Sequence, residues 1–460
     1  MISLFIEEVN RIAKIIKPLI KEKNVKILSH FDADGIASAA IIAKLIIRLD
    51  GNFQLRVYKQ LTEDVISELE GGSKDLLILC DFGSGQLKQL KPIIEQSYVL
   101  ILDHHEPLRS EHPNLFHLNP LLFGEEEISA SMVCYLLSKA VDPINTDLVD
   151  LAIIGAVGDM QDENWRFEGT ARKLLNEAEM LGKIAITKGL RLYGRNTRPL
   201  HKALEYSFNP IIPGITGSES QAVQFLSDLG ISIRTDDRWK RLCDLTEEEQ
   251  KVLASAIIIQ RLNFDKVDAA NIFGEIYNLV GKPLELQDAR EFSTILNACG
   301  KMHAAHIGFK LCMGDLSILP KIWTIIKEYK KLISDSVIWV RENLHKTKLA
   351  TYIFGNDKIP EEIIGTVCSI SLNSNIVSRD KPVIGFANAG DKVKVSARLA
   401  RNLNLNLRDI IVKAAKAVGG EAGGHRYAAG ALIDRGKEKE FIAAIEKEIN
   451  VMKWQKKQKK

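Results

Sequence analysis

Acidic residues and histidines stand directly after three short apolar runs of the chain, at 25–29, 76–80 and 98–102. Carboxylates suit hard divalent cations, and imidazole shifts the preference of a site from Mg²⁺ toward Mn²⁺. Side chains of both kinds at the ends of three neighbouring strands would converge on one place. We therefore expect a metal site there. The residues are His30, Asp32, Asp34, Asp81, Asp103, His104 and His105.

A fourth acidic group ends an apolar stretch at Gly155-Ala156-Val157-Gly158-Asp159. Two metal ions about 3.5–4 Å apart can activate a water molecule and stabilise the departing oxygen of a phosphoester. Any one of the four groups alone is more typical of a turn or a helix cap, but four that converge favour a binuclear site. The predicted ligands are His30, Asp32, Asp34, Asp81, His104 and Asp159.

The elements that must position these residues alternate between strands and helices over the N-terminal part of the chain. This alternation predicts an α/β fold with a parallel, doubly wound sheet, in which ligands bind outside the carboxyl ends of the strands. We expect strands at 25–29, 54–58, 76–80 and 98–102, and helices at 4–20, 35–49, 63–70, 85–96, 129–140 and 146–158.

The middle of the sequence is more helical, and the C-terminal part alternates again. The middle elements expected are helices at 170–193 and 246–262 and one long helix at 318–343. The C-terminal elements are strands at 349–354, 382–387, 392–397 and 428–433, helices at 360–371, 407–417 and from 437, and a glycine-rich turn at 419–424. The last eight residues hold five lysines and are expected to be disordered.

Composition limits the class of protein and its surroundings. At about 150 residues per domain, 460 residues correspond to two to four domains. No stretch approaches the roughly 20 apolar residues of a membrane span, and the six scattered cysteines without a C-x-x-C pair favour the reducing cytoplasm. The net charge of +3 divides into −8 for 1–190, +1 for 191–345 and +10 for 346–460. A basic C-terminal region suggests a polyanionic partner, although a solvated surface with a lysine tail explains the charge equally well.

The four acidic groups together resemble the signature of the DHH phosphoesterases. The resemblance implies that one metal ion binds His30, Asp32 and Asp81, and that Asp81 bridges to a second ion held by Asp34, His104 and Asp159. It also implies that His105 contacts the scissile phosphate and that Asp103 orients a histidine. The predicted catalytic residues are therefore His105, Asp81 and Asp103.

The C-terminal region resembles the DHHA1-type domain of the family members that cleave nucleic acid. The matching segments are Ser396-Ala397-Arg398 and a Gly-Gly-Gly-His-like loop at 419–425, in which Ala422 replaces a glycine. Glycine lets a backbone approach a phosphate closely, and an arginine can bind a phosphate through two hydrogen bonds. The predicted substrate-binding residues here are Arg398, Gly423, Gly424 and His425.

A third segment, Asn297-Ala298-Cys299-Gly300-Lys301, resembles a motif of the RecJ single-strand exonucleases. Lys301, where arginine is usual, is a further predicted substrate contact. The distance in sequence from Asp159 to His425 indicates an insertion, as in archaeal RecJ-like nucleases and the eukaryotic DHH-derived helicase cofactor. The segment 192–200 also resembles the archaeal RecJ-like nucleases. The predicted domains are a DHH catalytic core at 1–194, a helical inserted subdomain at 195–290, a return segment with the long linking helix at 291–345, and the DHHA1-type domain with its basic tail at 346–460.

These resemblances imply a two-metal exonuclease that degrades single-stranded DNA from the 5′ end in replication or repair, with RNA as the alternative strand. Mn²⁺ is the expected cofactor and Mg²⁺ the alternative. Two other functions stay open: a phosphodiesterase for short RNA or nucleotides, and a replisome scaffold with little or no catalysis. The archaeal group is known to bind the GINS complex, and the inserted subdomain at 195–290 is the expected docking surface. No membrane partner is expected.

Overall fold

The computed structural model describes residues 3–69, 75–162, 165–207, 211–262, 269–270, 272–374, 376–400 and 403–457. Their contacts divide the chain into two compact units. The first consists of Met1–Ala203 and Val223–Ile326, and the second of Leu204–Ala222 and Lys327–Lys460. The boundaries fall within three helices, α8 (Leu200–Glu205), α9 (Glu219–Asp228) and α13 (Leu319–Glu342).

The first unit contains a five-stranded sheet in the order β2-β1-β3-β4-β5, and every neighbouring pair is parallel. The carboxyl ends of all five strands therefore lie along one edge, as the sequence predicted. The fifth strand, β5, was not expected. The strands are β1 (Val25–His30), β2 (Phe53–Tyr58), β3 (Leu76–Cys80), β4 (Tyr98–Leu102) and β5 (Leu115–Leu118).

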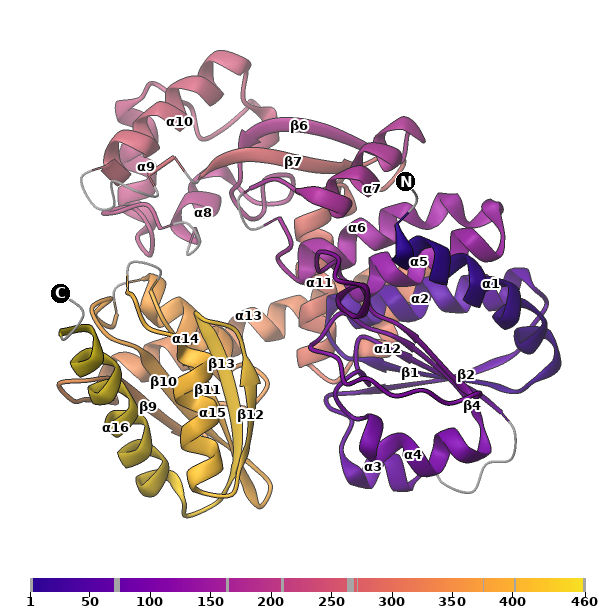
Figure 1. Ribbon diagram of the computed structural model, residues 1–460. Coiled ribbons are helices and arrows are strands. Elements are labelled where there is room, and N and C mark those ends of the chain that lie inside the picture. The colour runs from indigo at the N-terminus through magenta and orange to yellow at the C-terminus, as the bar shows by residue number, and fades with distance from the viewer. Residues whose placement is uncertain are drawn as a thin grey trace. The chain divides into compact units, whose positions relative to one another are not determined.

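Helices cover both faces of this sheet (Figure 1). Leu77, Leu79 and Ile101 point to the face that α3 and α4 cover, where they share a core with Leu90 and Ile93. The opposite face carries α2, which is apolar and buried on nearly all sides between the sheet, α5 and α6. The helices are α1 (Leu4–Glu22), α2 (Ala33–Arg48), α3 (Glu63–Ser67), α4 (Leu87–Gln96), α5 (Ala130–Val141) and α6 (Val149–Gly158).

The remainder of the first unit corrects one prediction. The helix expected at 170–193 ends early: α7 (Gly169–Met180) is followed by Gly182 at a φ of +65° and then by strand β6 (Ile184–Leu190). A glycine in this conformation ends a helix, and the pairing of β6 with a distant strand, β7 (Phe273–Leu279), then stabilises an extended backbone. Helix α10 (Glu247–Leu262) lies within the insertion, α11 (Ala289–Lys301) begins at its end, and α12 (Ala305–Met313) follows.

The second unit has a mixed sheet in the order β12-β13-β11-β10-β9-β8. Helices α15 and α16 pack on one face through a core that includes Tyr352 and Phe386, and α14 lies against β10 and β11. The glycine-rich turn expected at 419–424 is shorter than predicted, because 421–424 pair with β13 as strand β12. The elements are β8 (Leu344–Lys346), β9 (Thr351–Asn356), α14 (Ile364–Asn373), β10 (Val383–Ala389), β11 (Lys392–Arg398), α15 (Leu407–Ala417), β12 (Glu421–Gly424), β13 (Ala428–Asp434) and α16 (Glu438–Lys457).

These features confirm the predicted fold class: a parallel α/β core, a largely helical middle and a smaller C-terminal α/β region. The tail prediction is wrong in part, because α16 continues to Lys457; residues 458–460 lie outside the described residues. All six cysteines are free. Among the described helices, none has the length and apolar character needed to cross a bilayer.

Candidate metal centre

The loop from β1 to α2 places His30 beside an acidic helix cap. Asp32 is the N-cap of α2, and its Oδ1 accepts a hydrogen bond from the amide of Gly35 at 3.0 Å. The other oxygen of Asp32, Oδ2, lies 3.0 Å from Nδ1 of His30. A carboxylate is favoured at a helix N-terminus by the free amides and the helix dipole. The start of α2 therefore fixes Asp32 with one oxygen turned toward His30.

Asp81 lies at the centre of the cluster, directly after β3. Its backbone has a φ of +65°, a conformation that non-glycine residues rarely adopt. The carboxylate is only 2% exposed and stands between two imidazoles: Oδ2 is 3.2 Å from Nδ1 of His30, and Oδ1 is 3.3 Å from Nε2 of His104. The latter contact lacks hydrogen-bond geometry, so Oδ1 is buried without a hydrogen-bond donor among the described residues. In the described part of the chain, the charge on this oxygen is balanced only by the nearby imidazoles, so it can still accept a bond from a cation.

The Asp-His-His triplet after β4 directs two imidazoles in different ways. Asp103 is fully buried; its Oδ1 lies 2.8 Å from Nδ1 of His105, and its Oδ2 accepts a hydrogen bond from the amide of Ser84. Asp103 therefore orients His105, whose side chain is 56% exposed and can reach a bound molecule. His104 is buried, and its Nδ1 lies 2.9 Å from Oε1 of Glu127. Metal-binding histidines commonly use the second ring nitrogen for such a carboxylate.

Asp34 occupies a position different from that of the other acidic residues. Its Oδ2 accepts a hydrogen bond from the amide of Ala130 at 2.8 Å, and its Oδ1 accepts one from the amide of Ser131 at 3.1 Å. These amides belong to the first turn of α5, which attracts a negative charge. Asp159, the C-cap of α6, accepts a hydrogen bond from Nε2 of Gln161, and its Oδ2 lies 3.8 Å from Nδ1 of His104.

A glycine of the fourth motif explains how α6 comes close to this site. A methyl group at Gly155 would overlap Oγ of Ser131 and would stand 2.5 Å from Oδ1 of Asp34. The absence of a side chain at 155 thus lets α6 lie against the start of α5 and the Asp34 carboxylate. This close packing brings Asp159, one turn further along α6, to the edge of the cluster.

The charges in the cluster shift the pKa values of its members. Burial and the nearby Asp81 raise the pKa of Asp34 to about 7. Burial also raises the pKa of Asp159 well above its usual value, more strongly than His104 lowers it. Burial opposes a charge on His104, but the carboxylates of Asp81 and Glu127 outweigh this effect and raise its pKa. The cluster therefore retains protons that bound cations would displace.

Potential ligand atoms gather in three overlapping groups, each within 4.8 Å. Nitrogen and oxygen donors of this kind fit Mn²⁺, and Asp81 belongs to two of the groups. The prediction did not include Glu127, which belongs to a run of three glutamates with no spacing that indicates metal binding. Asp34, which was predicted, belongs to none of the groups. They are Asp81, Asp103, His104 and His105; His30, Asp32 and Asp81; and His104, Glu127 and Asp159.

Three family models match successive parts of the chain: the N-terminal domain of the DHH family at 24–156, the DHH-CID domain at 192–272 and the DHHA1 domain at 346–451. The chain belongs to the DHH family. This DHH protein is also 33% identical over 459 residues to an uncharacterized protein of Methanocaldococcus jannaschii, covering 96% of this chain and 98% of the relative. The predicted membership of the DHH family is confirmed.

Solved structures show where the same fold occurs. The DHH protein is similar to RecJ of Thermus thermophilus in complex with Mn²⁺ (16% identity, TM-score 0.61, 96% of this chain and 55% of that chain). It is similar to another structure of exonuclease RecJ bound to manganese (16% identity, TM-score 0.56, 96% of this chain and 94% of that chain). It is also similar to CDC45 of Entamoeba histolytica (13% identity, TM-score 0.65, 97% of this chain and 99% of that chain). The chain thus spans about half the length of the Thermus RecJ. At these identities the comparisons show a shared fold.

The segment on α11 that resembles a RecJ motif lies against the loop between β1 and α2, which carries His30 and Asp32. Oδ1 of Asn297 accepts a hydrogen bond from the amide of Ala33 at 3.0 Å. A methyl group at Gly300 would overlap the carbonyl oxygen of Phe31, so the helix and the loop are in close contact. The sequence predicted Lys301 as a substrate contact, and the structure places it at the C-terminal end of α11, next to this contact. The role of Asn297 was not predicted.

The predicted substrate-binding residues of the DHHA1 domain form a separate group in the second unit. Arg398 ends β11 and donates hydrogen bonds from Nε to Oγ of Ser369 and from Nη1 to the carbonyl of Ala397, each at 2.9 Å. Gly423, Gly424 and His425 are exposed at the end of the edge strand β12. The amide of His425 bonds to the carbonyl of Ala428, which closes the turn to β13.

Proposed function

We propose that this RecJ-like DHH protein is an exonuclease that hydrolyses the phosphodiester bonds of single-stranded DNA from the 5′ end, in replication or repair. The observation that carries the proposal is the buried Oδ1 of Asp81, which accepts no hydrogen bond from any described residue and faces His104 while Oδ2 faces His30. A carboxylate between two imidazoles is a suitable bridge between two cations.

Two divalent cations, with Mn²⁺ preferred over Mg²⁺, would bind the six predicted ligands, with Asp81 shared between them. The cations would supply an activated water and stabilise the charge that develops on the phosphate oxygens. Glu127 would hold His104 so that Nε2 faces Asp81. RecJ structures with bound Mn²⁺ support this choice, and a RecJ structure with bound Mg²⁺ supports Mg²⁺ as the alternative.

His105 would contact the scissile phosphate. Burial opposes its positive charge, but the hydrogen bond to Asp103 raises its pKa to about 9. At neutral pH the imidazolium would therefore donate to a phosphate oxygen. Lys301 would add a second positive charge. In the DHHA1 domain, Arg398, His425 and the backbone of Gly423 and Gly424 would bind the phosphate and sugar of the terminal nucleotide.

The test is digestion of single-stranded DNA and RNA, labelled at the 5′ or the 3′ end, with Mn²⁺ or Mg²⁺. Mononucleotides released first from the 5′ end of DNA are the expected result. Asp81→Ala should abolish cleavage. Asp75→Ala is a matched control, because Asp75 precedes the same strand but contacts Lys26 outside the site. Undiminished cleavage by Asp81→Ala would overturn the proposal.

A phosphodiesterase for short RNA or nucleotides uses the same metal chemistry. The rates on a dinucleotide and on a strand of about 30 nucleotides separate the two activities. Faster turnover of the dinucleotide would favour the phosphodiesterase.

A replisome scaffold is the second candidate, favoured by the similarity to CDC45 over nearly the whole chain. We propose that residues 195–290 bind GINS, and α10 offers two exposed apolar side chains there, Val252 and Ile259, which are 44% and 62% exposed. Charge at these positions, in Val252→Glu with Ile259→Glu, should prevent capture of purified GINS. Met180→Glu is the control, because Met180 is 81% exposed outside the insertion. GINS binding retained by the double variant would reject this surface.

A further inference from the structure

A buried carboxylate, Asp162, joins two arginines that are far apart in the sequence. Its Oδ2 accepts hydrogen bonds from Nη2 of Arg191 and from Nη2 of Arg290, each at 2.5 Å. The side chain of Asp162 is 1% exposed and that of Arg191 is 3% exposed. Hydrogen bonds between ions are stronger than those between neutral groups, and a buried charge requires such partners. The three side chains therefore form one interdependent group.

Asp162 belongs to the same turn as Asp159, the proposed metal ligand. Between them, Gln161 bonds through its amide to the carbonyl of Ala156, and its side chain donates to Oδ2 of Asp159 and accepts from the amide of Ser129. Met160 has a φ of +59°, so the backbone of the turn is held in an unfavourable conformation. Such a turn keeps its shape only if its surroundings fix it.

The surroundings on the far side of the turn are Trp165 and the β6–β7 pair. The amide of Trp165 bonds to the carbonyl of Asp162, and the guanidinium of Arg191 stacks 4.0 Å from the centre of the Trp165 ring. The amide of Glu275 in β7 bonds to the carbonyl of Trp165. The turn is thus attached to a two-stranded sheet as well as to α6.

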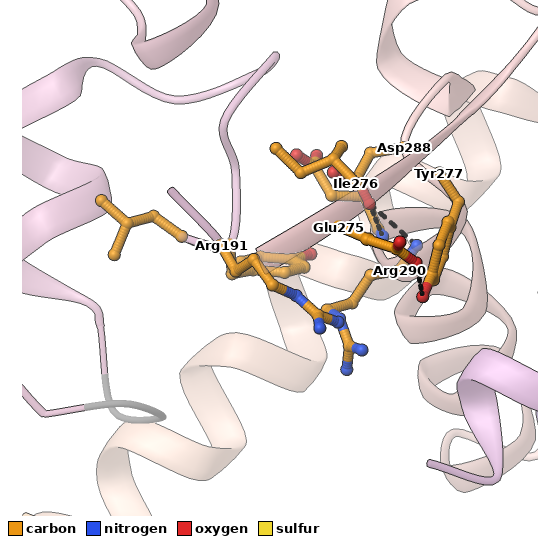
Figure 2. A pocket seen from close by; sticks show the side chains of 9 residues that line it. Arg191, Glu275, Ile276, Tyr277, Asp288 and Arg290 are labelled. Carbon is orange, nitrogen blue, oxygen red and sulfur yellow. Dashed lines mark hydrogen bonds between the residues drawn. The ribbon is translucent and has the colours of Figure 1, made fainter. Parts of the chain in front are cut away.

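The two arginines come from the two ends of the inserted region. Arg191 directly follows β6, and the DHH-CID match begins at the next residue; Arg290 lies in the first turn of α11. Both side chains line one pocket of about 340 Å³, mouth included, together with Glu275, Tyr277 and Asp288 (Figure 2). Arg290 and Arg191 have no other carboxylate partner at hydrogen-bond distance among the described residues.

We propose that Arg191 and Arg290 are positioning residues, which through Asp162 hold the turn that presents Asp159 to the metal centre. This inference rests on the proposed metal-dependent function. If either arginine is lost, Asp162 retains only one partner and the turn is held less firmly. Changes in the groups that orient metal ligands commonly weaken metal affinity about 10–100-fold.

Arg290→Gln tests this role, because Arg290 is 30% exposed and its replacement leaves the Arg191–Asp162 pair in place. The dissociation constant for Mn²⁺ is measured on the full chain from the electron paramagnetic resonance signal of free Mn²⁺. Weakening of about tenfold is expected. Arg290→Lys keeps the charge for the single hydrogen bond and should restore the affinity to within about threefold of wild type.

Arg172→Gln is the matched control. Arg172 is 34% exposed and pairs with Glu275 at 2.6 Å on the same strand, β7, but contacts no residue of the turn in the described structure. Its Mn²⁺ affinity should stay within twofold of wild type, while thermal melting without metal falls as in Arg290→Gln. Equal Mn²⁺ affinities for Arg290→Gln and Arg172→Gln would overturn the positioning role and leave the proposed function standing. A wild-type protein that binds no Mn²⁺ would overturn the proposed function and this inference together.

Discussion

The close contact at Gly155 gives a sharp test of how the fold builds the metal centre. Alanine in place of a helical glycine ordinarily stabilises a protein by up to about 1 kcal/mol. At Gly155 the added methyl would overlap Oγ of Ser131, and it would stand 2.6 Å from Cβ of Ser131 and 2.5 Å from Oδ1 of Asp34. Overpacking of a rigid core costs about 1–3 kcal/mol. Here α6 is buried along its length, so it cannot move away without opening other contacts.

We therefore expect Gly155→Ala to lower the free energy of unfolding by about 2 kcal/mol instead of raising it. For a unit of this size, that corresponds to a fall in Tm of about 3–6 °C. Because the methyl also displaces Asp34, Mn²⁺ affinity should fall about tenfold. Circular dichroism melting without metal measures the first effect, and titration with Mn²⁺ measures the second.

Gly308→Ala is the control for this substitution. Gly308 lies in α12, and the nearest atoms to an added methyl are at 3.3 Å, a tight but tolerable contact. The Tm of the Gly308→Ala protein should change by less than half the change expected for Gly155→Ala, and its Mn²⁺ affinity should stay at the wild-type value. A Gly155→Ala protein with wild-type Tm and wild-type affinity would refute the argument that this glycine exists to admit Asp34 and Ser131.

Three further predictions concern protons and charge at the same site. Glu127→Gln should weaken Mn²⁺ binding about tenfold, because His104 loses the carboxylate that orients it; an unchanged affinity contradicts this role. The pKa of Asp34 is raised to about 7, so this proposed ligand is protonated below that pH. Mn²⁺ affinity should therefore rise from pH 6 to pH 8, with release of protons to the buffer. An affinity that does not change with pH would argue against Asp34 as a ligand. Asp103→Asn should return the pKa of His105 from about 9 toward 6.5, which at pH 8 reduces the protonated fraction of His105 roughly 30-fold. Cleavage by this variant should therefore fall far more at pH 8 than at pH 6. Equal losses of activity at both pH values would exclude the protonation of His105 as the cause.

The parallel core could be predicted from sequence because its signals are local. Each apolar run is a strand buried on both faces, and a polar residue at its end marks the edge where the chain leaves the sheet. Strand β5 was missed because Leu115–Leu118 is short and includes His117, which breaks the apolar run. The helix expected through 184–190 was wrong because those residues adopt a strand only by pairing with β7, about 90 positions later.

The residues of the candidate site also divide into those that the sequence could predict and those that it could not. Residues in the motifs could be found, since their spacing is fixed by strand ends and by the first turn of α2. Glu127 could not be found, because its role depends on the loop before α5 passing beside His104. The positions of Asn297, against the loop between β1 and α2, and of Asp162, between two arginines, likewise depend on contacts between distant segments. A single sequence contains no signal for such pairs.

Backbone amides hold most of the motif carboxylates in place. Asp32 and Asp34 are each held by amides at a helix N-terminus, on α2 and α5 respectively. Asp103 is held by the amides of Ser84 and His104. Backbone amides do not titrate, so they keep these carboxylates in place while protons leave and cations enter. Asp81 differs, because its Oδ1 accepts no hydrogen bond from an amide or other donor in the part of the chain that the structure describes. The fold thus fixes the carboxylates of Asp32, Asp34 and Asp103 through amides and leaves a buried oxygen of Asp81 to be satisfied by a cation, which is the arrangement a bridging ligand requires.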